Sequence, residues 1–322
     1  LRLEQIAQKL NKPARISIRV NPNVDAKTHP YISTGLNENK FGVSIETARK
    51  MYIYAKKSKF LNPVGIHFHI GSQLTEIAPI CDAAKIVSDL LRELRALEID
   101  IKFFDVGGGI GIRYEDEKQI VLYDYAQGIL RSLSGLDVTI ACEPGRFITG
   151  AAGVFLTRVL YEKQNCGKRF VIVDGAMNDL IRPSLYGAHH AIEIVSASEG
   201  INLNEPGASG VNLGGRGLDQ TSGSGADEKI LDGANLVAGS LCDVVGPICE
   251  SGDFLAKGVS LPSLQSGDLL AIKSAGAYGF SMSSNYNTRC RAAEVAVYDG
   301  QDRLIRKRES FDELIALEKD FV

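Results

Sequence analysis

Tryptophan is absent from this 322-residue chain, and no apolar run is long enough to cross a membrane. A membrane-spanning helix needs ~18 or more consecutive apolar residues, and every hydrophobic run here is shorter. Lysine and arginine form no basic cluster, and the formal net charge is −3. These absences exclude a basic binding surface of the usual kind, so we expect neither a nucleic acid nor a membrane as a partner.

Paired cysteines are also missing. The six cysteines run from Cys81 to Cys290 without a single C-x-x-C spacing. This pattern argues against a structural zinc site and a disulfide framework, and it favours a reducing compartment. We expect a cytoplasmic protein; a plastid location is compatible if a longer chain carries a transit peptide.

The chain begins inside a helical pattern. Apolar residues recur at helical spacing at Leu1, Leu3, Ile6 and Leu10, and no methionine or targeting signature comes first. We therefore expect that residues preceding Leu1 in the natural protein are lacking here.

Residues 1–148 alternate short apolar runs with helical patterns. Strands are expected at 15–20, 39–43, 64–70, 101–106 and 138–142, with helices at 44–57, 83–97 and 123–133. Such alternation predicts an α/β fold with a parallel sheet covered on both faces, as in a TIM-type barrel. We count five strand–helix units of the eight that a closed (β/α)8 barrel needs.

From about residue 149 to residue 322 the pattern becomes that of strands. Apolar runs at 154–160, 170–173, 269–272 and 292–297 have few helices between them, and 311–319 favours a closing helix. This predicts a second, mostly antiparallel β domain. Within it, the glycine-rich stretch 197–240 is expected to be a flexible insertion.

Three consecutive glycines, Gly107 to Gly109, directly follow the apolar run that ends at Val106. Without side chains, their N–H groups are open to the close approach of a phosphate. A second apolar run ends in Glu143–Arg146, a carboxylate and an arginine around a rigid turn. In a β/α barrel both motifs lie at the carboxyl ends of strands, so together they predict a site for a phosphorylated cofactor.

His67 and His69 belong to the third predicted strand. Alternate residues of a strand face the same side, and metal-binding barrels use this spacing for two ligands. The later strand ends offer glycines and an arginine rather than further ligands, so we expect no metal. His69, followed closely by Ser72, fits better beside a flat cofactor ring and its phosphate.

Five motifs in one order carry a resemblance to a known family. They are His69–Ser72, Asp105–Gly109, Glu143–Arg146, Gly246–Asp253 and Gly276–Tyr278. From about Ile16 onward, the chain resembles the fold-type III pyridoxal-phosphate decarboxylases, and among them those that act on diaminopimelate. The resemblance implies that residues 1–148 bind pyridoxal 5'-phosphate and that residues 149–322 form a β-rich domain. The implied reaction is decarboxylation of meso-2,6-diaminopimelate to L-lysine, the last step of lysine biosynthesis.

The resemblance also implies a role for each matching residue. His69 would stack on the cofactor ring, and Glu143 would bond its pyridine nitrogen. The other cofactor-binding residues would be Ser72, Gly108, Gly109, Gly145, Arg146 and Tyr278. The substrate-binding residues would be Arg146, Arg182, Tyr186, Glu250 and Tyr278. Cys249 would donate a proton during the reaction. In this family the residues matching Cys249 and Glu250 come from the partner subunit, which implies a homodimer with shared active sites.

The charge of the substrate distinguishes the members of this family. Diaminopimelate carries a carboxylate and an ammonium at its far end, and Arg182 with Glu250 would match that pair. Decarboxylases that recognise only a distal ammonium typically have Cys-Asp in place of Cys249-Glu250. A decarboxylase of ornithine, arginine or carboxynorspermidine is the alternative within the family. A non-catalytic paralogue that binds a partner is the alternative outside catalysis.

One feature of the family is missing. Its members bind the cofactor through a lysine in a Tyr-Ala-x-Lys-Ala-like context, and no lysine here has that context. Together with the count of strand–helix units, this predicts that roughly a hundred N-terminal residues are absent. We expect the chain as given to be inactive as a decarboxylase.

Overall fold

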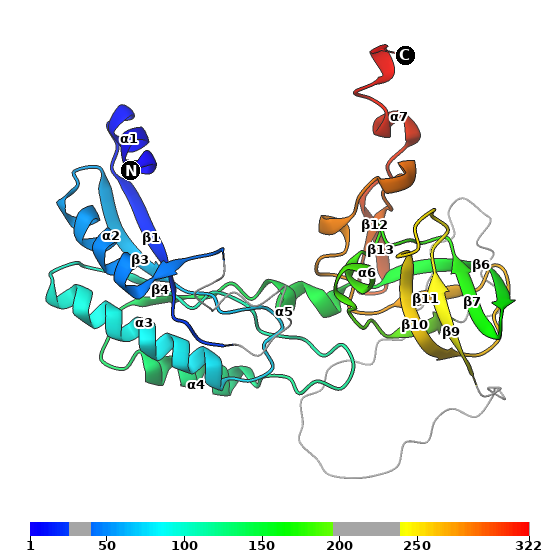
Figure 1. Cartoon of the computed structure of the whole chain (residues 1–322), viewed down its shortest axis with the longest axis horizontal. Helices are drawn as coiled ribbons and strands as arrows, with labels where there is room; N and C mark the ends of the chain where they lie inside the picture. Colours follow the sequence, from blue (N-terminus) through cyan, green and yellow to red (C-terminus); the bar gives the residue numbers. More distant parts are fainter. Residues whose placement is uncertain (26–39, 196–238, 322) are drawn as a thin grey trace, which may run out of the picture. The chain divides into compact units, whose positions relative to one another are not determined.

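The computed structural model describes residues 1–25, 40–195 and 239–321, which form two compact units, Leu1–Gly153 and Val154–Val322 (Figure 1). Each unit has its own hydrophobic core. All but the last two residues of the expected insertion 197–240 lie outside the described residues. Within the described part, no helix has both the length and the apolar character needed to cross a bilayer.

Five parallel strands make up the sheet of the first unit, in the order β2-β1-β3-β4-β5. They are β1 (Ala14–Asn21), β2 (Val43–Ser44), β3 (Leu61–His67), β4 (Phe103–Asp105) and β5 (Thr139–Ala141). β1, β3, β4 and β5 are consecutive neighbours, as strands are in a β/α barrel. The two-residue β2 instead pairs with the end of β1, at Val20 and Asn21. The predicted five units therefore correspond to five parallel strands, of which these four are consecutive neighbours.

Helices alternate with these strands, as predicted. They are α1 (Arg2–Lys9), α2 (Ile45–Lys57), α3 (Ala78–Ala96), α4 (Leu122–Ser132) and α5 (Gly145–Thr149), followed by the 3-10 turn η1 (Gly150–Ala152). Ser44 caps α2 by accepting a hydrogen bond from the N–H of Thr47 at 3.2 Å. α3 begins at Ala78 rather than at residue 83, because the proline at position 79 is well tolerated in the first turn of a helix.

The core of the first unit lies between the sheet and the helices α2, α3 and α4 (Figure 1). Four strand residues are buried in it: Ile18, Val20, Ile66 and Phe104. Strand residues alternate between two faces, so Arg19 projects to the face opposite Ile18 and Val20. This alternation sends apolar side chains toward the helices and leaves polar ones for the other face and the strand ends.

β3 ends at His67, so the strand predicted at 64–70 is displaced toward the N-terminus. Phe68 follows it, and its N–H donates to the carbonyl oxygen of Asp105 at 3.0 Å. Phe68 and Ile70 are buried, and these apolar residues extended the predicted strand beyond its real end. His69 therefore lies in the segment after β3 rather than in the strand itself.

Tyr52 of α2 joins the helix layer to the sheet. It is fully buried, and its hydroxyl donates to the carbonyl oxygen of Gly65 in β3 at 2.6 Å. Replacing Tyr52 with phenylalanine keeps the ring but removes this donor. We expect the free energy of unfolding to fall by about 1 kcal/mol. Urea unfolding followed by circular dichroism measures the change. The exposed Tyr123 of α4 gives the control variant Tyr123→Phe, and an equal loss in both variants would contradict this account.

Six strands form the main sheet of the second unit, in the order β10-β9-β7-β6-β11-β8. They are β6 (Phe155–Asn165), β7 (Lys168–Val173), β8 (Ile192–Val195), β9 (Ser240–Val245), β10 (Phe254–Leu261) and β11 (Leu269–Ile272). All neighbouring strands run antiparallel except β7 and β9. The mostly antiparallel character predicted for this region is confirmed.

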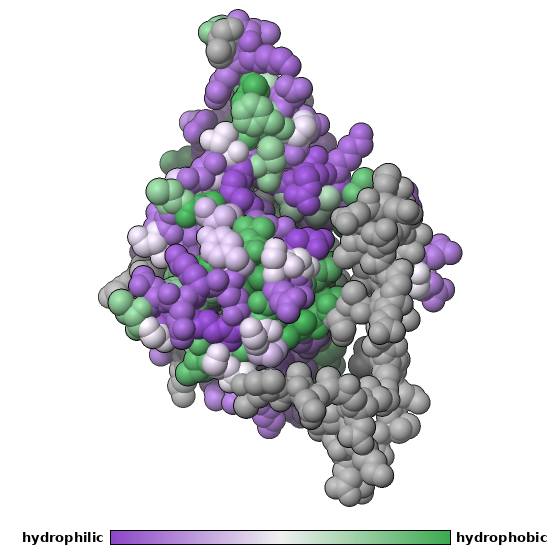
Figure 2. All heavy atoms as spheres, turned by 90° about the vertical axis from the view of Figure 1, so that its right-hand side faces the viewer, coloured by the Kyte–Doolittle hydropathy of each residue, from purple (hydrophilic) through white to green (hydrophobic). Residues whose placement is uncertain are grey.

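Short elements complete the second unit. They are α6 (Arg182–Tyr186), η2 (Phe280–Met282), η3 (Tyr286–Thr288), β12 (Glu294–Tyr298), β13 (Gln301–Arg306), α7 (Phe311–Leu314) and η4 (Lys319–Phe321). The closing helix predicted at 311–319 is thus shorter than expected. The β12–β13 hairpin exposes more than half of each of four apolar side chains, Val295, Val297, Leu304 and Ile305. Figure 2 shows apolar groups reaching the surface between hydrophilic ones.

Candidate active site

The strand ends of the first unit bring four polar side chains to one edge of the sheet. Arg19 of β1 is level with His67 of β3, and His67 is level with Asp105 of β4. Glu143 follows β5, and its N–H donates to the carbonyl oxygen of Gly107 at 2.8 Å. Parallel strands end at the same edge, and β/α barrels carry out their chemistry there.

His67, Asp105 and Glu143 form a compact group of potential ligands. One nitrogen or oxygen atom from each lies within 4.8 Å of the others, and His67 Nε2 is 3.6 Å from Glu143 Oε2. Burial lowers the pKa of His67, although the two carboxylates oppose this shift. The sequence-based expectation that later strand ends offer no ligands is wrong on this point, because Asp105 and Glu143 place carboxylates there. The group has the donor set to hold a cation or a proton.

His69 has a fixed, neutral ring. The N–H of Gly108 donates to its Nδ1 at 3.1 Å, and Arg19 donates to its carbonyl oxygen at 3.2 Å. An acceptor nitrogen carries no proton, so the neutral ring has its proton on Nε2. Burial, with the charge of Arg19 as the next cause, lowers the pKa of His69 to about 4. A flat, uncharged imidazole of fixed orientation is suited to stacking on an aromatic ring.

The glycine loop packs backbone against backbone. A Cβ on Gly108 would lie 2.0 Å from the carbonyl oxygen of Glu143, and one on Gly109 would lie 2.0 Å from that of Gly71. Gly109 also has a φ of 103°, which favours glycine. No larger residue fits at either position. The amide of Gly108 is already bonded to His69, and that of Gly107 donates to Asp105 Oδ1 at 2.8 Å.

Ser72 lies in the loop after β3, beside the glycine loop. Gln73 fixes this loop by two hydrogen bonds to the backbone of Ile112. Its Nε2 donates to the carbonyl oxygen of Ile112 at 2.6 Å, and its Oε1 accepts from the N–H of Ile112 at 3.2 Å. The N–H of Leu74 donates to the carbonyl oxygen of Gly109 at 2.8 Å. The two loops therefore form one surface, on which Ser72 is partly buried.

Arg146 is buried in α5. Its Nη1 donates to the hydroxyl of Tyr114 at 2.6 Å, and its guanidinium carbon lies 5.7 Å from the centre of that ring. Gly145 donates its N–H to the carbonyl oxygen of Glu143 at 2.8 Å. A Cβ on Gly145 would meet nothing within 4 Å, so packing does not require glycine there.

The titration of His69 gives a testable pH dependence. Its pKa falls from an ordinary value of 6.5 to about 4, so between these values the unfolded chain binds a proton that the folded chain does not. The stability that this group contributes is fully present above pH 6.5 and is lost as the pH falls toward 4. His67 acts in the same direction, because burial also lowers its pKa.

We expect the melting temperature to fall over this pH range in the cofactor-free chain, and to fall less in His69→Asn. The asparagine oxygen can still accept from the N–H of Gly108, but it does not titrate. Dye-based thermal melts across the range measure the difference. His189→Asn, at an exposed histidine, is the matched control. An identical pH profile in His69→Asn and the unaltered chain would rule out His69 as the cause.

In the second unit, Arg182 begins α6 and is buried. Its Nη1 donates to Nε2 of His190 at 2.8 Å, and Nδ1 of His190 lies 2.8 Å from the carbonyl oxygen of Lys273. Tyr186 ends the same helix and is partly exposed. Tyr278 follows β11 with a left-handed backbone φ of 60°, and its side chain is exposed.

Cys249 and Glu250 lie in the loop between β9 and β10, and both are exposed. The carboxylate of Glu250 has fixed partners. Its Oε1 accepts from the N–H of Gly252 at 3.0 Å, and its Oε2 lies 3.4 Å from the hydroxyl of Tyr286, which donates to it. The thiol and the carboxylate are thus presented by one short segment.

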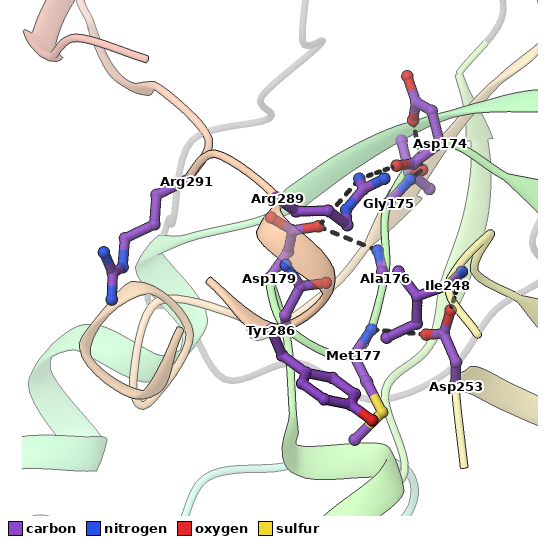
Figure 3. A network of polar contacts seen from close by, with 12 residues as sticks. Asp174, Gly175, Ala176, Met177, Asp179, Ile248, Asp253, Tyr286, Arg289 and Arg291 are labelled. Carbon is purple, nitrogen blue, oxygen red and sulfur yellow. Dashed lines mark hydrogen bonds and ion pairs between the residues drawn. The ribbon is translucent and has the colours of Figure 1, made fainter. Parts of the chain in front are cut away.

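Asp253 anchors this loop from within the unit (Figure 3). Its buried carboxylate accepts from the N–H of Ile248 at 3.0 Å and from the N–H of Met177 at 2.7 Å. Burial raises the pKa of Asp253, and the two backbone donors oppose that shift. The segment around Met177 is held in turn by Arg289, which lies 3.8 Å from Asp179. One carboxylate therefore ties the loop of Cys249 and Glu250 to the segment that leads into α6.

Replacing Asp253 with asparagine should loosen both segments. One carboxylate oxygen becomes an NH2 group that faces an N–H donor, so one buried backbone donor loses its acceptor at a cost of about 1–3 kcal/mol. We expect faster hydrogen exchange in residues 174–179 and 246–254 together. Asp302→Asn, on the exposed strand β13, is the control. Faster exchange in only one of the two segments would contradict the proposed tie.

The predicted site residues thus fall into groups within each unit. In the first unit His69, Gly108, Gly109 and Glu143 lie together, with Ser72 beside them. In the second, Cys249 and Glu250 share a loop, and Arg182 and Tyr186 share a helix. Sequence patterns assigned no role to five contributing side chains: Arg19, Tyr114, His190, Asp253 and Tyr286. A charged residue between buried neighbours at a strand end was the one available signal, and it applies to Arg19.

Comparison with known proteins places the chain among relatives along nearly its whole length. Residues 1–150 match the family model described as "Pyridoxal-dependent decarboxylase, pyridoxal binding domain". The diaminopimelate decarboxylase of Campylobacter jejuni is 59% identical over 321 residues, which cover 99% of the chain and 70% of that protein. The enzyme of the same name from Helicobacter pylori is 51% identical over 318 residues, again 99% of the chain and 70% of the relative.

Solved structures agree with these matches. The crystal structure of diaminopimelate decarboxylase from Helicobacter pylori complexed with L-lysine has a TM-score of 0.84 at 51% identity. It is matched over 99% of this chain and 70% of that one. A lysine decarboxylase from Selenomonas ruminantium, at 19% identity and a TM-score of 0.68, shares the fold.

Proposed function

Because the chain belongs to the diaminopimelate decarboxylase family, we propose that it catalyses the decarboxylation of meso-2,6-diaminopimelate to L-lysine, the last step of lysine biosynthesis. The observation that carries this proposal is the high identity to the Campylobacter and Helicobacter relatives along nearly the whole chain. The chain spans about 70% of the length of those relatives, so the activity is proposed for the enzyme to which these residues belong.

The strand ends of the first unit fit pyridoxal 5'-phosphate, the cofactor of this family. The neutral ring of His69 is suited to stacking on the cofactor ring, and the half-exposed carboxylate of Glu143 is suited to its pyridine nitrogen. For the phosphate, the hydroxyl of Ser72 and the backbone of Gly109 lie on one surface. The N–H of Gly108 already donates to the ring of His69, so the role proposed for Gly108 is to orient that imidazole.

Glu143 has a clear chemical task at this site. Pyridoxal 5'-phosphate, when bound here, would supply an acceptor for the electron pair that remains as carbon dioxide leaves. A carboxylate beside the pyridine nitrogen keeps that nitrogen protonated, because it stabilises the positive charge there. His67 Nε2 lies 3.6 Å from Glu143 Oε2, so the imidazole is near enough to act electrostatically on this carboxylate.

The second unit supplies the residues proposed to read the substrate. Arg182 matches the distal carboxylate of diaminopimelate, and Glu250 matches its distal ammonium. Cys249, on the same loop as Glu250, is proposed to deliver a proton to the carbon that has lost its carboxylate. The remaining contacts to substrate or cofactor are assigned to Gly145, Arg146, Tyr186 and Tyr278.

A decarboxylase of ornithine, arginine or carboxynorspermidine is the second candidate. A substrate whose far end carries only an ammonium lacks the carboxylate that the guanidinium of Arg182 would bind, so it would forgo that charge-assisted contact. The pairing of Arg182 with Glu250 therefore favours diaminopimelate. A non-catalytic paralogue is disfavoured, because binding alone needs neither Glu143 nor Cys249.

We also propose a homodimer with shared active sites, working in the cytoplasm. The exposed apolar side chains of the β12–β13 hairpin are of the kind that an interface covers. All six cysteines are free, which suits a reducing compartment.

A chimera tests the proposed function. It joins this chain to the part of the Campylobacter jejuni relative that the match does not cover. With pyridoxal 5'-phosphate, we expect the chimera to form L-lysine and carbon dioxide from meso-diaminopimelate. The 322-residue chain alone should form neither, because none of its lysines has the family's cofactor-binding context. Amino-acid chromatography and carbon dioxide release measure both products.

One further variant and two alternative outcomes complete this test. Glu143→Ala in the chimera should lower kcat about 100-fold or more, since the site loses preorganised charge stabilisation. Decarboxylation of ornithine, arginine or carboxynorspermidine in place of diaminopimelate would establish the second candidate. Lysine formation by the 322-residue chain alone would show that one of its own lysines serves the cofactor.

A further inference from the structure

His190 is a buried histidine that contacts Arg182, and it has no role in the function described above. It is 2% exposed and lies between α6 and β8. Its Nε2 is 2.8 Å from Nη1 of Arg182, and its Nδ1 is 2.8 Å from the carbonyl oxygen of Lys273. We propose that His190 is a positioning residue, which sets the guanidinium of Arg182 for the distal carboxylate of the substrate. This inference rests on the proposed function of Arg182.

The two contacts define the proton of the imidazole. A carbonyl oxygen only accepts hydrogen bonds, so Nδ1 of His190 carries the proton and donates to Lys273. Nε2 is then the acceptor for the N–H of Arg182. A second proton on the ring would set two donors, and two positive charges, against each other at 2.8 Å. His190 therefore offers Arg182 a neutral acceptor whose direction is fixed. The hydrogen bond of Nδ1 sets the tautomer and the orientation of the ring, as the hydrogen bond of the other ring nitrogen does for histidines that bind metals in other proteins.

The backbone around Lys273 makes this arrangement rigid. The N–H of Lys273 donates to the carbonyl oxygen of Ala191 at 2.8 Å, next to the antiparallel ladder of β8 and β11. His190 thus joins the end of that ladder to the first residue of α6. The chain continues from Lys273 to Tyr278, so His190 connects two segments to which substrate contacts are assigned.

The direction of Arg182 matters because its donors form a planar fork. A guanidinium binds a carboxylate best through two parallel hydrogen bonds, which need the plane of the fork to be set correctly. A bond from Nη1 to a fixed acceptor removes rotation about the end of the side chain. Loss of the acceptor should therefore weaken recognition of the distal carboxylate and leave the chemistry at the reacting carbon in place.

Two variants of His190 in the chimera separate its two hydrogen bonds. His190→Asn keeps a donor near the position of Nδ1 for Lys273 and loses the acceptor for Arg182. His190→Gln places an amide oxygen near the position of Nε2, where it can still accept from Arg182. L-lysine and cadaverine are the probes, because lysine has a carboxylate and an ammonium on one carbon and cadaverine has no carboxylate. Their inhibition constants report binding without catalysis.

We expect His190→Asn to raise the inhibition constant of L-lysine about 10-fold, which is the effect of one lost hydrogen bond to a charged group. KM for diaminopimelate should rise similarly while kcat changes less than about 3-fold. His190→Gln should stay within about 3-fold of the unaltered enzyme, and cadaverine should bind equally in all variants. His189→Asn, at the exposed neighbour, is the matched control.

A double-mutant cycle with Arg182→Ala shows whether His190 acts through Arg182. Arg182→Ala alone should weaken the binding of L-lysine about 100-fold. Adding His190→Asn to this variant should weaken that binding by less than a further factor of about 2. An additive effect of His190→Asn in the Arg182→Ala background would overturn the inference, as would unchanged lysine binding in His190→Asn. If Arg182→Ala leaves lysine binding unchanged, the proposed function of Arg182 fails instead, so the two failures are distinct.

Discussion

Backbone contact between neighbouring strand ends is the constraint on which the first site depends. The Cα of Gly108 lies against the carbonyl of Glu143, and that of Gly109 lies against the carbonyl of Gly71, at distances that exclude any Cβ. This approach draws the loops after β3, β4 and β5 into one surface. It also brings the N–H of Gly108 to the ring of His69, which fixes the tautomer of the buried, neutral imidazole. The positions of the polar groups at the strand ends therefore depend on the lack of side chains at Gly108 and Gly109.

In the second unit, hydrogen bonds from buried polar side chains, rather than close backbone packing, hold the predicted site residues in place. Its segments are irregular, and buried polar side chains hold them through hydrogen bonds to the backbone. Asp253 binds two amides from separate segments, and His190 binds one carbonyl and one guanidinium. Buried polar groups of this kind specify one arrangement, because any other arrangement would leave a donor or an acceptor without a partner.

Sequence patterns predicted the architecture because apolar periodicity follows burial. β11 has the predicted bounds, and the parallel and antiparallel regions were both foreseen. β10 was missed because the Lys257-Gly258 pair interrupts its pattern, and β13 because all its residues are exposed. The site motifs around Gly108 and Glu143 could be predicted, since close packing and chemistry restrict the residue types. Arg19, His190 and Asp253 could not, because their roles depend on pairing across the sheet or between distant segments, and short-range periodicity carries no such information.

The double tie at Asp253 has a mechanical consequence for the second unit. Two loops that share one buried carboxylate cannot shift independently, because a movement of either one stretches a short hydrogen bond to the other. The loop of Cys249 and Glu250 and the segment leading to Arg182 therefore behave as one body rather than as two flexible arms. Substitutions that alter one loop will be felt in the other, so the two segments are expected to vary in a correlated way among functional sequences.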